Sequence, residues 1–233
     1  MNRFFLYVVS VMFLSTNVGM AQVIHVKSPN GKIDMALESG EKISWSVKHE
    51  NTEVIAPSTI SLTLGGGVVL GNNAKVISTK NSKVSASFAT PVYKKVSVID
   101  EYNEVIVKFN GGFGLILRAY NDGVAYRFFT SKKGQILIES EEATFNFSKD
   151  HKAYVPYVRD LRENDLYTSA FECNYVEIPL SKFVKDSLAI SPLLVDLGNG
   201  KKAAIIEADL EDYPGMFLRG TRGRRLRGIF APF

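Results

Sequence analysis

The sequence is poor in the residues that usually bind metals or act as nucleophiles. It has one cysteine, Cys173, and three histidines, His25, His49 and His151, among 233 residues. One cysteine excludes an internal disulfide, so the fold must be stabilised by a hydrophobic core. The histidines show no metal-ligand spacing, and the sequence contains neither a Gly-x-Ser-x-Gly motif nor a phosphate-binding loop. Carboxylates are therefore the remaining source of catalytic or metal-binding groups.

Long apolar runs are confined to the first residues of the chain. Asn2 and Arg3 precede a mostly apolar run over 4–14, and the small residues at 19 and 21 lie three and one before Gln22. This pattern predicts a secretory signal peptide over 1–21, cleaved after Ala21. The run is too short and too interrupted for a transmembrane anchor. We therefore expect an exported protein, periplasmic or secreted, with no membrane partner.

The basic charge of the chain is concentrated at its C-terminal end. The net charge is +4, with 28 basic and 24 acidic side chains. Arg3 belongs to the predicted signal peptide, and the last fifteen residues contain no acid but five arginines, Arg219, Arg222, Arg224, Arg225 and Arg227. Without these six arginines the chain has 22 basic and 24 acidic residues, a net charge of −2. Since the body has no basic surplus, we expect no nucleic-acid partner.

The pattern after residue 22 is that of short strands separated by turns. Apolar and polar residues alternate, for example at Ile43, Trp45 and Val47, and Gly, Asn, Ser or Pro separate the runs. No period of 3.6 residues persists for three turns, and the one candidate helix is a short one near 161–167. About 210 residues suit one large domain. The sequence predicts an all-β fold of stacked antiparallel sheets over 22–218.

The hairpin Gly114–Thr130 is expected to lie at the centre of this fold. Its two alternating strands flank Asn121-Asp122-Gly123, and Asp-Gly readily supplies the positive φ angles of a tight turn. Both faces of the hairpin carry bulky residues, so we expect each face to be covered by another part of the fold, as in a stack of sheets. Arg118 and Arg127 are expected to meet acids or backbone carbonyls. The expected core residues are Phe113, Leu115, Leu117, Val124, Tyr126 and Phe128.

The acids of interest are Glu172, Glu207 and Asp209. Glu172 lies between Phe171 and Cys173, where it either points outward from an ordinary strand or is held for a purpose. The run 203–209 predicts an apolar strand that ends in two carboxylates, Glu207 and Asp209, on one face. For these two the simplest interpretation is alternate outward residues of an edge strand.

Several segments together resemble a known family, glycoside hydrolase family 97, which contains alpha-glucosidases and alpha-galactosidases of Bacteroidetes. The segments follow the order of the family: Ser28-Pro29-Asn30-Gly31, the run 118–127, Phe171-Glu172-Cys173-Asn174-Tyr175, and the run 206–218, Ile-Glu-Ala-Asp-Leu-Glu-Asp-Tyr-Pro-Gly-Met-Phe-Leu. Each is weak alone, but their combination over residues 23 to 233 is specific.

The resemblance implies a β-supersandwich like that of galactose mutarotases, packed against a catalytic (β/α)₈ barrel. It also implies that one glutamate of this domain binds a calcium ion together with glutamates of the barrel. The matching position is Glu172, and a carboxylate is the hard oxygen ligand that calcium prefers. The substrates implied are oligosaccharides with terminal alpha-glucosides or alpha-galactosides, and the sequence does not separate the two, nor retention from inversion of configuration.

The sequence stops where the family continues into its barrel. In the family the acid and the nucleophile or base lie on that barrel, so this chain is expected to be inactive by itself. It is either part of a longer hydrolase or, alternatively, a non-catalytic carbohydrate-binding or structural module. Residues 219–233 are expected to be a basic linker toward the barrel that packs poorly in this chain and docks its apolar end, 229–233, on the barrel.

Overall fold

The structure is a computed structural model that describes residues 22–92, 94–158, 166–167, 171–221 and 223–232. The predicted signal peptide, 1–21, lies outside the described residues, as does most of the candidate helix near 161–167. The strands are β1 (Gln22–Lys27), β2 (Ile33–Ser39), β3 (Ser44–His49), β4 (Thr52–Leu64), β5 (Val68–Leu70), β6 (Val76–Ala89), β7 (Ser97–Phe109), β8 (Phe113–Tyr120), β9 (Val124–Thr130), β10 (Ile138–Asn146), β11 (Lys152–Val155), β12 (Val176–Pro179), β13 (Leu193–Gly198), β14 (Lys201–Ile205), β15 (Met216–Gly220) and β16 (Arg225–Phe230), and a 3₁₀ turn, η1, covers Leu180–Lys182.

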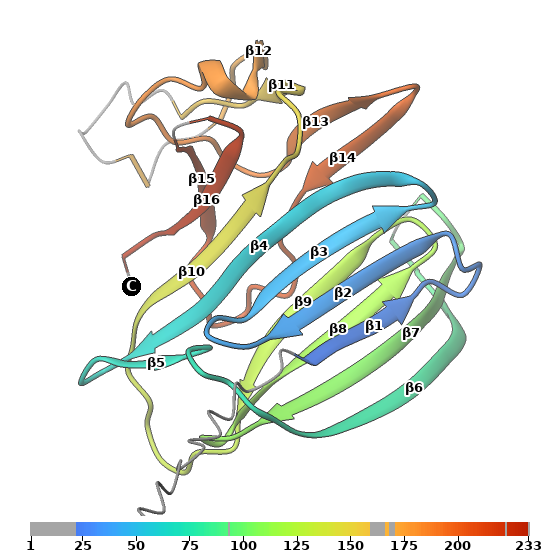
Figure 1. Ribbon diagram of the computed structural model, residues 1–233. Helices are drawn as coiled ribbons and strands as arrows, with labels where there is room; N and C mark the ends of the chain where they lie inside the picture. Colours follow the sequence, from blue (N-terminus) through green and yellow to red (C-terminus); the bar gives the residue numbers. More distant parts are fainter. Residues whose placement is uncertain (1–21, 93, 159–165, 168–170, 222, 233) are drawn as a thin grey trace, which may run out of the picture.

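The strands form three antiparallel sheets. The largest has the order β1-β2-β3-β4-β10-β16-β15, with β5 added beside β4, and the two others have the orders β6-β7-β8-β9 and β12-β11-β13-β14. Figure 1 shows the green strands β6 to β9 stacked on the blue strands β1 to β4, with β11 to β14 grouped at one end. The prediction of an all-β sandwich is confirmed. Among the described residues no helix is long and apolar enough to cross a membrane.

The core lies between the stacked sheets because apolar residues alternate along their strands. In β2 the buried residues Ile33, Met35 and Leu37 alternate with more exposed ones, as a strand with one covered face requires. The predicted hairpin is present as β8 and β9, paired from Phe113↔Thr130 to Ala119↔Val124. Its predicted core residues pack inward: those of β8 are buried, and those of β9, partly buried, contact the same cluster.

The second face of the hairpin is less covered than predicted. Strand β9 is the edge of its sheet, and its outward residues Ala125 and Arg127 are exposed in this chain. The expected arginine partners are present. Arg118 donates from Nε to Oε2 of Glu104 at 2.8 Å and lies over the Tyr102 ring, whereas Arg127 forms an ion pair with Asp209. The hairpin therefore has one buried face and one face held by polar contacts.

The C-terminal residues correct the prediction of a loosely packed linker over 219–233. Strand β16 lies between β10 and β15 in the largest sheet, and both pairings are antiparallel. Leu218 and Leu226 are fully buried in the core cluster. The sequence pattern did not predict this strand, because Arg225 and Arg227 alternate with Leu226 and Gly228 in a segment rich in arginine. The domain therefore continues through this tail.

Candidate functional site

Glu172 lies near the start of β12, an edge strand of the sheet β12-β11-β13-β14. Its side chain is exposed, and no hydrogen bond or ion pair joins it to another described residue. Two contacts hold the segment around Glu172. The Phe171 and Tyr175 rings meet edge to face with their centroids 5.6 Å apart, and the Tyr175 hydroxyl donates to the carbonyl of Pro192 at 3.2 Å. The exposed carboxylate is thus presented from an anchored segment.

An exposed carboxylate suits calcium as one ligand, since calcium takes hard oxygen donors at flexible geometry. It does not make a complete site, because calcium takes six to eight oxygens. Within the described ranges, no group of three or more His, Cys, Asp or Glu side chains is arranged to hold a metal ion. By itself Glu172 therefore supplies at most a small part of the oxygen ligands that a calcium ion requires.

Glu207 and Asp209 are placed differently from the prediction. Strand β14 ends at Ile205, so the predicted strand over 203–209 is too long and these two acids lie on the connection to β15. We call residues 206–215 the strap. Glu207 accepts a hydrogen bond from the Met216 amide at 2.8 Å, and Asp209, with a positive φ of 60°, pairs with Arg127 of β9. Both acids therefore hold the strap in place.

Sequence reasoning missed Glu141, which anchors the strap to β10. Tyr213 of the strap donates its hydroxyl to Oε2 of Glu141 at 2.6 Å, and its ring contacts Phe230 at 5.9 Å. Burial raises the pKa of Glu141, the Tyr213 hydrogen bond opposes this, and the nearby charge of Glu207 raises it further. A usable signal was present, since Glu141 precedes Ala143 and Phe145 in the inward alternation of the strand.

The proximity of Glu141 and Glu207 invites comparison with the carboxyl pair of a glycosidase. Burial also raises the pKa of Glu207, which the Met216 amide opposes. Each carboxylate already accepts an internal hydrogen bond, from Tyr213 and from Met216 respectively. Glu141 of β10 is thus bonded to Tyr213 of the strap, and Glu207 of the strap is bonded to Met216 of β15, so we assign both acids the structural role of fastening the strap to these strands.

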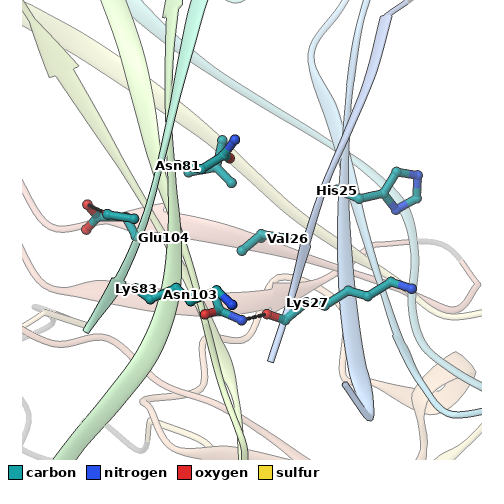
Figure 2. A pocket seen from close by; sticks show the side chains of 9 residues that line it. His25, Val26, Lys27, Asn81, Lys83, Asn103 and Glu104 are labelled. Carbon is teal, nitrogen blue, oxygen red and sulfur yellow. Dashed lines mark hydrogen bonds between the residues drawn. The ribbon is translucent and has the colours of Figure 1, made fainter. Parts of the chain in front are cut away.

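A cavity of about 420 Å³ lies between β1 and the hairpin of β6 and β7. Figure 2 shows Val26, Asn81 and Asn103 directed into it, whereas the side chains of His25 and Lys27 point away. Glu104 of the lining also turns away and accepts from Arg118, and the Asn103 amide donates to the carbonyl of Lys27 at 2.7 Å. Three ionisable side chains of the lining, His25, Lys27 and Glu104, are thus directed away from this cavity.

Comparison with known proteins places the chain in a family. Residues 26–232 match the family description Glycosyl-hydrolase 97 N-terminal. A retaining alpha-galactosidase of Bacteroides thetaiotaomicron is 34% identical over 210 residues, which are 88% of this chain and 32% of that protein. The chain therefore belongs to glycoside hydrolase family 97 and corresponds to the N-terminal domain of its members.

Solved structures share the fold. One is a family 97 enzyme of Pseudoalteromonas sp. strain K8, solved in complex with acarbose, with a TM-score of 0.77 and 24% sequence identity. The aligned region covers 90% of this chain and 32% of that enzyme's chain. A beta-arabinopyranosidase has a TM-score of 0.79 at 19% identity, with 90% of this chain and 35% of that chain covered. The chain thus spans about a third of the length of these relatives.

Proposed function

We propose that this chain is the N-terminal domain of an exported alpha-glycosidase that releases terminal alpha-galactosides or alpha-glucosides from oligosaccharides. The observation that carries the proposal is the 34% identity to a retaining alpha-galactosidase over 88% of the chain. That relative makes alpha-galactosides the first substrates to test. The enzyme solved with acarbose, at 24% identity, supports the fold and leaves alpha-glucosides as the second class.

Hydrolysis of a glycosidic bond requires a carboxylic acid and a carboxylate on either side of the anomeric carbon. Two carboxylates of the described residues, Glu141 and Glu207, are close to each other, but they are engaged by the Tyr213 hydroxyl and by the Met216 amide. We therefore assign the acid and its partner to polypeptide outside these 233 residues. The 233-residue chain by itself is expected to be inactive.

The contribution of this domain to the active site is Glu172 as a calcium ligand. Its exposure and its anchored segment, with Tyr175 bonded to the carbonyl of Pro192, support this assignment. When bound, calcium supplies a concentrated positive charge that orients carboxylates and sugar hydroxyls. The role of the sandwich is to hold the Glu172 carboxylate at a fixed place so that little ordering is needed when the ion binds.

The test compares the complete gene product with the chain 22–233 on chromogenic alpha-galactosides and alpha-glucosides. We expect the complete protein to hydrolyse at least one of the two and the shorter chain to hydrolyse neither. Proton NMR of the first sugar released reports whether the anomeric configuration is retained, as in the galactosidase relative. A complete protein that is inactive on both substrates, or activity in the chain 22–233 alone, would contradict the proposal.

A further inference from the structure

Three arginines lie on one face of the last two strands. In β15 and β16 the buried residues Leu218, Leu226 and Gly228 point to the core, so the alternate positions point outward. We call the outward residues Arg219, Arg225 and Arg227 the arginine face. Arg225 and Arg227 are exposed and Arg219 is half-buried. The charge noted in the sequence is therefore gathered on one surface of a packed sheet.

The arrangement of these arginines is unfavourable within the chain itself. Arg219 and Arg227 are directly opposite each other across β15 and β16, a position in which like charges repel. Nε of Arg219 is buried and has no hydrogen-bond partner. In the described part of the chain, the arginine ion pairs are those of Arg118 and Arg127, and none involves the arginine face. Buried donors of this kind are normally satisfied in the native protein.

Neighbouring polar groups are already engaged. Glu142, the outward acid of the adjacent β10, accepts hydroxyl hydrogen bonds from Thr59 at 2.8 Å and Ser61 at 3.2 Å. Nε of Arg225 donates to the side-chain oxygen of Asn146 at 2.9 Å. Beside Arg219 on the same face lies Phe217, which is half-buried. Phe217 also meets the Tyr167 ring edge to face. Among the described residues, arginines beside aromatic rings with no free carboxylate at hand are typical of an interface rather than of a solvated strand.

We propose that the arginine face binds carboxylate side chains of the polypeptide that follows residue 233 in the longer protein. This inference rests on the proposed function. Guanidinium groups pair with carboxylates through two parallel hydrogen bonds, which would satisfy Arg219 and relieve its repulsion with Arg227. The position favours this occupant, because the Ala231 amide donates to the carbonyl of Gly215 and so keeps the described C-terminal residues on the same two-stranded ladder that carries the arginine face.

The length of the relatives supports the same occupant. This chain covers 32% of the alpha-galactosidase, so two thirds of that protein lies outside the matched region. A nucleic acid or an anionic membrane is a poorer match for the face, since the rest of the chain has a net charge of −2 without the six arginines of its two ends. Carboxylates of the same polypeptide are also held at high effective concentration.

The test is hydrogen exchange of the amides of β15 and β16 in the complete gene product and in the chain 22–233. In the complete protein we expect the double variant Arg219→Gln/Arg227→Gln to exchange about tenfold faster or more at these strands, since it loses charge-assisted hydrogen bonds that hold them closed. In the chain 22–233 the same variant should not accelerate exchange, because the partners are missing. Amides of β8 serve as an internal reference.

Arg224→Gln is the matched control, because Arg224 is exposed, adjoins β16 and bonds the carbonyl of Ser148 instead. It should leave exchange in the complete protein unchanged. Acceleration by the double variant in both proteins, or in neither, would overturn the inference. Glycosidase assays of the same wild-type samples separate the two proposals: activity without the exchange effect refutes the docking alone, and the exchange effect without activity refutes the proposed function alone.

Discussion

Replacing Leu226 by alanine should strongly destabilise the chain, although this residue lies in the arginine-rich tail. Leu226 has 0% of its surface exposed and lies in register with Phe145 of β10 and Gly220 of β15. Gly220 has no side chain that could fill the cavity left by the lost leucine side chain. The Phe183 side chain already packs against it, 2.4 Å from the place where a Cβ would be. Buried Leu→Ala substitutions cost about 2–5 kcal/mol, and the rigid neighbours favour a value of about 3 kcal/mol or more.

For a domain of this size about 3 kcal/mol lowers Tm by roughly 6–12 °C. Urea unfolding of the chain 22–233 measures the loss, and the midpoint should fall at an unchanged m value. The control is Ile206→Ala, which removes a side chain that is 63% exposed and should change stability by less than about 0.5 kcal/mol. If Leu226→Ala costs no more than this control, then the tail is peripheral and its assignment to the core is wrong.

Two further substitutions test the strap and the hairpin. Tyr213→Phe removes the hydrogen bond to Glu141 and should cost about 1.5–3 kcal/mol near pH 7 by denaturant unfolding. Because burial raises the pKa of Glu141 in the folded protein, the stability that its proton provides is present below its ordinary pKa and is lost as pH rises through the folded value. The Tyr213 hydrogen bond acts in the opposite direction, since it favours the ionised carboxylate and is stronger when Glu141 is charged. The cost should therefore shrink near pH 4, and a cost independent of pH would refute this. Gly114→Ala should cost at least about 2 kcal/mol, because a Cβ would lie 2.3 Å from both the Phe129 ring and the carbonyl of Val107; a neutral effect on Tm would contradict the close packing.

The fold was predictable because its main signals are local. The hairpin of β8 and β9 follows from alternation around Asn-Asp-Gly, and the inward residues of β8 are buried as expected. The strand β16 was not recognised, because arginines surround Leu226 and only its pairing with β10 and β15 makes it a strand. The excess length predicted for β14 has a similar cause, since contacts of Glu207 and Asp209 with distant residues end the strand at Ile205.

The site was predictable only in part. Glu172 was identified from a family resemblance, and its exposure is compatible with the role proposed for it. Glu141 was missed because its partner Tyr213 is 72 residues away in the chain and its burial depends on the strap. The arginine face likewise depends on register: the sequence gives five arginines, but only the pairing of β15 with β16 sets Arg219 opposite Arg227.

Calcium titration of the complete gene product tests the account most directly. Glu172→Gln keeps the shape of the side chain but removes the charge that a divalent ion favours, so we expect calcium affinity to fall at least about tenfold, with a lower rate on the hydrolysed substrate and an unchanged Tm of the metal-free protein. Glu177→Gln is the control, since Glu177 lies on β12 and pairs at the surface with Lys152 at 2.6 Å. Equal calcium affinity and rate in wild type and Glu172→Gln would contradict the role assigned to this domain.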